Sequence, residues 1–241
     1  IKYCAKIVNF FVLLINLWIN NDEWCYQLKK RIFESQFIKM SKENQSNLLV
    51  TFSNIISNVL NPLFSLLIFF VVYSYQKSEG EINLKSFILP ILLVIIPIFG
   101  WIYWNVKKGN YINMDVSNRK QRNSLYLFNF FIISIYIAVL FYTNQNFHYI
   151  LIIIFLLVLM VVMFLSNLFI KSSMHTSFNV FVSCLFFALN PIYGFIWLFL
   201  TILVAISRII LKRHTVKEVI MGAFIAVIVS FVYLYFDIQN H

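Results

Sequence analysis

The sequence predicts an all-α membrane protein, a polytopic helical bundle with about six to seven spans. Of its 241 residues, 61% are hydrophobic and 12% are charged, whereas soluble domains are about half apolar and about a quarter charged. The apolar residues gather in runs that approach the ~20 residues needed to cross a ~30 Å hydrocarbon core. The run ILIIIFLLVLMVVMFL at 150–165 does not alternate between polar and apolar residues, as the strands of a membrane barrel do. The spans are therefore predicted as helices, which satisfy their own backbone hydrogen bonds.

Residues 1–48 are predicted as an N-terminal region that precedes a membrane helical domain at 49–241. The apolar segment at 4–20 is interpreted as a span, an anchor or a signal-like segment, although it lacks a clear small-residue cleavage site. The polar stretch 21–48 interleaves aromatic residues with basic ones, which suits an amphipathic helix on the membrane surface. A solvated connector explains this stretch equally well, so both interpretations stay open.

Seven apolar segments are predicted as the spans of the membrane domain. They cover about 49–74, 87–104, 124–142, 149–170, 177–189, 192–206 and 216–236. The first contains Asn61-Pro62, and the second ends in the interfacial aromatic cluster WIYW at 101–104. Asn190-Pro191 predicts a turn between the fifth and sixth spans, because proline disfavours helix in the residue before it.

Three polar inserts are predicted to meet on one side of the membrane. The insert 105–123 precedes the third span, and each later pair of spans crosses and returns, so 171–176 and 207–216 lie on the same side. Together the inserts and the residue after the last of them contain Lys107, Lys108, Arg119, Lys120, Arg122, Lys171, Arg208, Lys212, Arg213 and Lys217. The turns at 143–148 and 190–191 contain no lysine or arginine. Two explanations stay open, the positive-inside rule for cytoplasmic loops and an anion site that holds phosphate.

Two of the four histidines, His175 and His214, lie in these inserts and indicate phosphoryl transfer. One imidazole can attack phosphorus, the other can protonate the departing oxygen, and arginines can neutralise the equatorial oxygens of the transition state. The sequence offers no acidic cluster that would hold magnesium. We therefore expect neither a metal nor another cofactor.

Glu218 has two interpretations that the sequence alone leaves open. It follows His214 by four residues, so on one helix the two side chains share a face, and the carboxylate could hold one ring nitrogen while the other attacks. The pattern Thr215-x-x-Glu218 is also that of a capping box at the start of a helix.

The last two inserts resemble two signatures of the type 2 phosphatidic acid phosphatase (PAP2) superfamily. Residues 207–222, SRIILKRHTVKEVIMG, resemble the third signature, S-R-x5-H-x3-D, with Glu218 in place of the aspartate. SSMH at 172–175 resembles the second signature, P-S-G-H, with Met174 in place of the glycine.

The first signature, K-x6-R-P, is matched more weakly by DVSNRKQRN at 115–123. Arg122 falls on its arginine, but Asp115 stands where the lysine belongs and Asn123 replaces the proline. The order of the three matches and their common side of the membrane support the resemblance, which covers about half of the chain.

The resemblance implies a PAP2-like core and a role for each matching residue. His214 would be the nucleophile that forms a phosphohistidine, His175 the general acid, and Glu218 the partner that orients His214. Arg208, Arg122 and Ser173 would bind the phosphate by resemblance, and Arg119 and Lys171 are added as phosphate contacts from their location alone.

The predicted function is that of a multi-pass phosphatase of the cell membrane, with a lipid phosphate and the bilayer as partners. The substrate would be a phosphate monoester or diphosphate of the phosphatidate, phosphatidylglycerophosphate or polyprenyl diphosphate type. A catalytically altered relative is the alternative, one that binds lipid headgroups or passes phosphate to another acceptor. Nucleic acid is not expected as a partner, because the cations sit in short loops between spans. A transporter is disfavoured because the last five spans are nearly free of charge.

Overall fold

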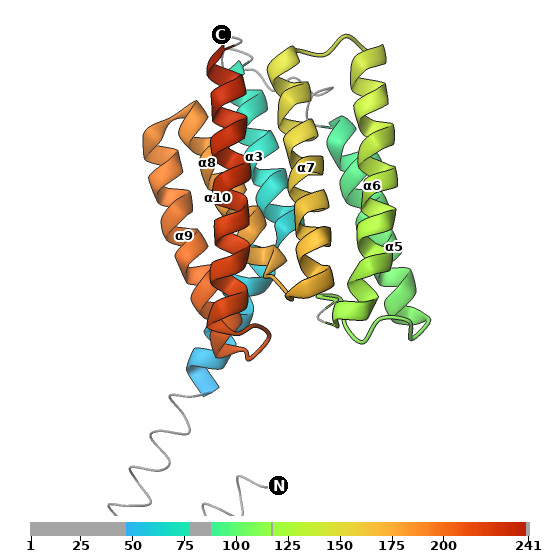
Figure 1. The fold of residues 1–241 in the computed structure, drawn as a ribbon, viewed down its shortest axis with the longest axis vertical. Coiled ribbons are helices and arrows are strands. Elements are labelled where there is room, and N and C mark those ends of the chain that lie inside the picture. The colour runs from blue at the N-terminus through green and yellow to red at the C-terminus, as the bar shows by residue number, and fades with distance from the viewer. Residues whose placement is uncertain (1–46, 78–87, 117, 240–241) are drawn as a thin grey trace, which may run out of the picture. The chain divides into compact units, whose positions relative to one another are not determined.

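Helices and their connecting turns make up the part of the chain that the structure describes. The computed structural model describes residues 47–77, 88–116 and 118–239, and no strand occurs in these ranges (Figure 1). Five of the helices are long and apolar enough to cross a membrane, or up to six if one bent helix pair counts as a single span. The predicted all-α membrane bundle is therefore confirmed, although α8 (Met174–Leu189) is a shorter apolar helix.

The chain divides into two compact units, 1–51 and 52–241, and the site described below lies in the second. The predictions for 4–20, and for all but the last two residues of 21–48, fall outside the described residues. The predicted domain boundary after residue 48 stays a prediction.

A bend of 52° separates the helix Asn47–Val59 from α3 (Pro62–Lys77). Proline has no N–H to donate, and its ring clashes with the preceding helical turn, so the first helix ends before Pro62. The Asn61 side chain then caps α3, because its Oδ1 accepts hydrogen bonds of 3.0 Å from two backbone N–H groups in the first turn.

The remaining helices follow in chain order. They are η1 (Ile91–Ile95), which is a π-helical segment, α5 (Ile96–Lys107), α6 (Arg119–Tyr142), α7 (Phe147–Phe169), α9 (Pro191–Ile210) and α10 (Val216–Gln239). Asn118 and Ser173 cap α6 and α8 by accepting hydrogen bonds from their first turns. These two helices therefore begin several residues before the predicted spans, because their caps lie within the polar inserts and not at the edges of the apolar runs.

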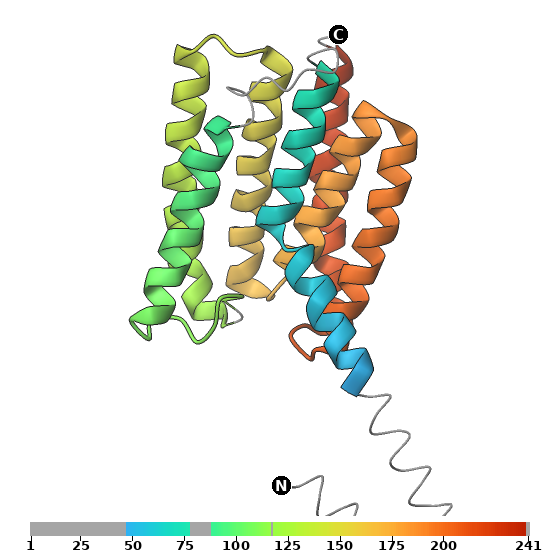
Figure 2. The ribbon, with the colours of Figure 1, turned by 180° about the vertical axis from the view of Figure 1, so that it is seen from behind.

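Helix α8 lies at the centre of the second unit. It contacts α3, α9 and α10, while α7 contacts α6 and α10, and α6 contacts α5. Figure 2 shows α3 alongside α8 from the side opposite to Figure 1. The buried Asn179 is a polar link in this packing, since its Oδ1 accepts hydrogen bonds from Ser65 of α3 at 2.9 Å and from Trp197 of α9 at 3.3 Å. These hydrogen bonds fix the position of α8 near its start. His175 lies in the same helix, one turn before Asn179.

Candidate functional site

The three predicted polar inserts lie together at one end of the bundle (Figure 1). They connect α5 to α6, α7 to α8 and α9 to α10, whereas the turns at 143–146 and 190 lie at the other end. The alternation of the helices therefore brings together residues that are far apart in the sequence, as the counting of spans predicts.

The α9–α10 connector reverses the chain sharply and so presents His214. Arg213 N–H donates to the Arg208 carbonyl at 3.1 Å, and Lys212 N–H donates to the Ile209 carbonyl at 2.9 Å, which is the hydrogen-bond pattern of a Schellman helix end. Lys212 adopts the left-handed conformation that this motif requires, with φ of 54°. His214 is thereby carried back over the last turn of α9, where its N–H also donates to the Arg208 carbonyl at 3.3 Å.

The His214 ring is buried between a carboxylate and a guanidinium. Its Nδ1 lies 2.8 Å from Glu218 Oε2, and its Nε2 lies 3.2 Å from Arg122 Nη2. A guanidinium can only donate, so Nε2 accepts and the ring proton sits on Nδ1, which donates to Glu218. Burial, together with the charges of Arg122, Arg208 and Lys171, lowers the pKa of His214 to about 2. The neutral ring thus keeps an unprotonated electron pair on Nε2, which a nucleophile requires and which here accepts the hydrogen bond from Arg122.

Glu218 makes both of the contacts that its sequence position suggests. Its Oε2 accepts hydrogen bonds from His214 Nδ1 and, at 3.2 Å, from the Thr215 N–H. In return, Thr215 Oγ1 accepts from the Glu218 N–H at 3.3 Å, which completes a capping box at the start of α10. A single carboxylate oxygen therefore caps the helix and orients the histidine.

Arg122, in the first turn of α6, connects the three inserts. Its buried guanidinium donates from Nε to the Val116 carbonyl and from Nη1 to the Ser172 carbonyl, both at 3.0 Å. Its third nitrogen, Nη2, faces His214. Arg122 thus holds a positive charge beside His214 Nε2 and fixes the spacing of the loops around it.

His175 lies in the first turn of α8, and the cap of that helix joins it to α10. Ser173 Oγ accepts hydrogen bonds from the Thr176 N–H at 3.4 Å and the Thr176 hydroxyl at 3.0 Å. The Ser173 N–H donates to the Glu218 carbonyl at 3.0 Å. These bonds set the second insert against the start of α10, where His214 is oriented, while the predicted phosphate contact of Ser173 stays a prediction.

Gly222 allows α10 to approach this cap closely. A Cβ at Gly222 would lie 2.7 Å from the Ser173 carbonyl oxygen and 2.8 Å from Ser177 Oγ. Ser177 Oγ itself donates toward the carbonyls of Ser173 and Gly222, at 2.9 and 2.8 Å. Any side chain at Gly222 would therefore separate the two segments that carry the histidines.

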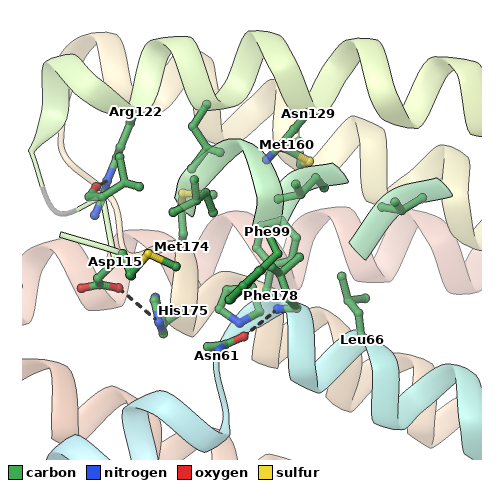
Figure 3. Close-up of a pocket in the computed structure, with 18 of the residues that line it drawn as sticks. Asn61, Leu66, Phe99, Asp115, Arg122, Asn129, Met160, Met174, His175 and Phe178 are labelled. Carbon is green, nitrogen blue, oxygen red and sulfur yellow. Dashed lines mark hydrogen bonds and ion pairs between the residues drawn. The ribbon is translucent and has the colours of Figure 1, made fainter. Parts of the chain in front are cut away.

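Arg208 is fully buried and faces Asp115, which also contacts the second histidine. Arg208 Nη1 donates to Ser57 Oγ at 2.9 Å, and its Nη2 donates to Asp115 Oδ2 at 2.6 Å. Arg213 Nη1 donates to the same oxygen at 2.6 Å. The other oxygen, Oδ1, lies 3.3 Å from His175 Nε2 (Figure 3).

The charges around Asp115 keep it ionised. Burial alone would raise the pKa of the Asp115 carboxyl, but His175, Arg208 and Arg213 hold that pKa well below its usual range. The cluster therefore contains a carboxylate anion, Asp115, in direct contact with the cations Arg208 and Arg213.

Two predicted phosphate contacts, Lys171 and Arg119, are held by backbone carbonyls. Lys171 Nζ donates to the Arg213 carbonyl at 3.0 Å, beside the α9–α10 connector. Burial, with the charge of a neighbouring arginine, lowers the pKa of Lys171. Arg119 donates from Nε to the Asn167 carbonyl at 2.5 Å and from Nη2 to the Leu168 carbonyl. The structure thus places Arg119 at the end of α7 and does not join it to the two histidines.

Sequence reasoning missed two members of the cluster, Asp115 and Arg213. In the sequence, Asp115 is recognisable only as a departure from the first signature, and Arg213 only as one of many basic residues. Their positions in the sequence could have indicated them. Asp115 stands where the first signature has its phosphate-binding lysine, and Arg213 directly precedes His214. Within the described ranges, no group of three His, Cys, Asp or Glu side chains is arranged to hold a metal ion.

A pocket of about 180 Å³ opens from this cluster into the bundle. Its polar end includes Asp115, Arg122 and His175, and its walls are otherwise mostly apolar, with side chains such as Leu66 and Phe99 (Figure 3). The walls come from α3, η1 with α5, α6, α7 and α8. The pocket thus changes from polar at the cluster to apolar inside the bundle, which suits a ligand with a charged head and an apolar chain.

Residues 166–241 match the family model of the PAP2 superfamily. The matched segment runs from the end of α7 through α10 and contains His175, Arg208, His214 and Glu218. The predicted resemblance is therefore confirmed for this segment, which indicates a phosphatase-type family. No curated protein and no solved structure matches the chain.

Proposed function

Because residues 166–241 match the PAP2 superfamily, we propose that this protein is a membrane lipid phosphatase that works through a phosphohistidine. The observation that carries the proposal is the His214 ring, whose proton lies on Nδ1 toward Glu218 while Nε2 faces the buried guanidinium of Arg122. This arrangement pairs an available nucleophile with cations that can hold the oxygens of a phosphate.

In the first step, His214 Nε2 attacks the phosphorus atom of the substrate. An N–P bond forms as the bond from phosphorus to the leaving oxygen breaks, which is the lipid oxygen of a monoester or the bridging oxygen of a diphosphate. The protonated form of His175 donates its proton to that oxygen. Arg122 and Arg208 neutralise the charge that spreads over the equatorial oxygens. Arg213, which directly precedes His214 on the connector between α9 and α10, adds a third cation to this group.

In the second step, a water molecule replaces the histidine on phosphorus. His175, now neutral, takes a proton from the water as its oxygen attacks, the N–P bond breaks, and inorganic phosphate leaves. Glu218 accepts the Nδ1 proton of His214 in a hydrogen bond throughout, so the ring keeps the tautomer that the first step needs. The cycle is balanced without a metal ion.

The proposed substrate is a lipid phosphate or diphosphate, of the phosphatidate, phosphatidylglycerophosphate or polyprenyl diphosphate type. Two observations support a lipid: the cluster lies at one end of helices that are long enough to span a membrane, and the adjoining pocket is mostly apolar. Along α6 the pocket extends from Arg122 to Ile133, which is ~16 Å at 1.5 Å per helical residue. The headgroup would bind the loops while the chain enters the bundle from the cell membrane.

Phosphate release by the purified protein tests the proposal. We expect the wild type to release phosphate from at least one member of a panel of lipid phosphates, and His214→Ala and His175→Ala to lower the rate by at least ~10²-fold. His148→Ala is the matched control, because His148 is paired with Asp237 at 2.8 Å at the other end of the bundle. Wild-type rates in both site variants would overturn the proposal, and a folded protein that binds lipid phosphates without releasing phosphate would favour the headgroup-binding alternative.

A further inference from the structure

Asp115 contacts the groups that the proposed function assigns to the substrate phosphate. Its Oδ2 lies 2.6 Å from both Arg208 Nη2 and Arg213 Nη1, and its Oδ1 lies 3.3 Å from His175 Nε2. Two guanidinium groups and an imidazole around one anion are the usual ligands of phosphate oxygens. The carboxylate therefore stands where those oxygens would lie.

The carboxylate leaves part of this anion site unused. Arg208 Nη2 donates to Asp115 and Nη1 donates to Ser57, but no acceptor among the described residues lies within reach of the buried Arg208 Nε. A guanidinium binds phosphate best through two parallel N–H groups, and here Nε and Nη2 form one such edge. A phosphate could use both nitrogens of this edge, whereas Asp115 uses one.

The backbone on either side of Asp115 is held in place. Tyr111 Oη shares a hydrogen bond of 2.7 Å with Ser124 Oγ of α6, and the Val116 carbonyl accepts from Arg122 Nε at 3.0 Å. Val116 is buried and has φ of 44°, a conformation that is a genuine outlier for a β-branched residue. Such outliers persist where the surroundings enforce them, frequently at functional sites. Displacement of the carboxylate is therefore a rotation of the Asp115 side chain, with the loop left in place.

We propose that Asp115 is an internal competitor for the phosphate site, a carboxylate that the substrate phosphate must displace from Arg208, Arg213 and His175. This inference rests on the proposed function of the same site. It makes Asp115 a specificity-determining residue, since any ligand must exchange with an anion that is already bound. The carboxylate returns to the arginines when phosphate leaves, so the buried charge of Arg208 stays paired between turnovers.

Binding of inorganic phosphate tests the inference without any need for turnover. In isothermal titration of the full chain in detergent, we expect Asp115→Asn to bind phosphate at least about tenfold more tightly than the wild type, because the competing charge is gone. Asp115→Glu, which keeps an anion at this position, should not show this gain. Asp237→Asn is the matched control, because it removes another buried carboxylate that also contacts a histidine but lies at the other end of the bundle.

Unchanged or weaker phosphate binding by Asp115→Asn would overturn the inference, and so would binding that is undetectable in every variant. Asp115→Ser provides a second test if the first variant does not fold. Unfolding of both would also contradict the inference, because a group on which the fold depends is not one that a substrate displaces. Tighter binding by Asp115→Asn together with no hydrolysis of any lipid phosphate would support the inference while the phosphatase proposal failed.

Discussion

At the scale of single residues, Glu218 joins a structural contact to a chemical one. Its Oε2 accepts a hydrogen bond from the Thr215 N–H, which is part of a helix cap, and one from His214 Nδ1, which sets the tautomer of the His214 ring. Thr215 takes part only in the first of these contacts, through its hydroxyl and its N–H. Substitutions at the two positions can therefore separate the effects.

Glu218→Ala and Thr215→Ala are expected to differ far more in activity than in stability. Each removes half of the capping box, at a cost of about 1 kcal/mol. Only Glu218→Ala leaves the His214 Nδ1 proton without its acceptor, so its kcat should fall by roughly 10²-fold or more, while Thr215→Ala keeps nearly the full kcat. Thermal unfolding and phosphate-release kinetics on the same preparations measure both quantities. Equal losses of activity in the two variants would show that Glu218 acts as a cap alone.

The lowered pKa of His214 predicts how stability depends on pH. Its folded-state pKa of about 2 lies below the ordinary histidine value of 6.5, so as the pH falls below about 6.5 the unfolded chain takes up a proton that the folded protein does not. The contribution of His214 to stability is therefore present above pH 6.5 and is lost progressively as the pH falls toward 2.

His214→Gln should reduce this pH dependence between about pH 6.5 and 5.5, a window above the one in which most carboxyl groups titrate. Unfolding by denaturant across this range, for the wild type and the variant, provides the measurement. His148→Gln serves as the control at the other end of the bundle. A stability curve of identical slope in the wild type and His214→Gln would mean that His214 titrates normally in the folded protein.

At the scale of helices, the close contact between α10 and the cap of α8 sets the spacing of the two histidines. Gly222→Ala would place a Cβ 2.7 Å from the Ser173 carbonyl oxygen, so α10 must move away. We expect a loss of about 1–3 kcal/mol in stability and a large fall in kcat, because His214 and His175 are carried by the two elements that separate.

Gly100→Ala is the matched control for this substitution. Gly100 lies within α5, and a Cβ there would meet no atom within 4 Å. Alanine favours helix over glycine by up to about 1 kcal/mol, so this variant should be equally or slightly more stable and fully active. Thermal unfolding and phosphate release again give the comparison, and wild-type behaviour of Gly222→Ala would contradict the proposed packing.

At the scale of the whole molecule, the sequence predicts the arrangement better than it predicts the contacts. Apolar run lengths predict the helices, and counting their crossings predicts that the three inserts meet at one end of the bundle. Helix starts were less well predicted, because α6 and α8 begin at capping residues within polar segments. A span predicted from apolar residues alone begins at the edge of an apolar run. Helix propensity and hydrophobicity therefore miss capping residues that lie in the polar segment before that run.

The direction of the long charged side chains could not be predicted from spacing. Arg119 precedes Arg122 by three residues, yet its guanidinium binds the carbonyls at the end of α7, whereas Arg213 reaches Asp115. Which carbonyls and carboxylates are nearby depends on how α6 packs on α7 and on the turn after α9. Those are properties of the folded molecule, and a motif match therefore identified the histidines but not all of their neighbours.

The most direct measurement of the central claim is the identification of the phosphorylated residue. His175→Ala should allow the first step with an aryl phosphate, whose leaving group needs no proton, and should slow the second step, which needs His175 as a base. Mass spectrometry of this variant after quenching at alkaline pH is expected to show one phosphoryl group on His214 and none in His175→Ala/His214→Ala. A phosphoryl group on another residue, or turnover with His214 unmodified at every time point, would contradict the account.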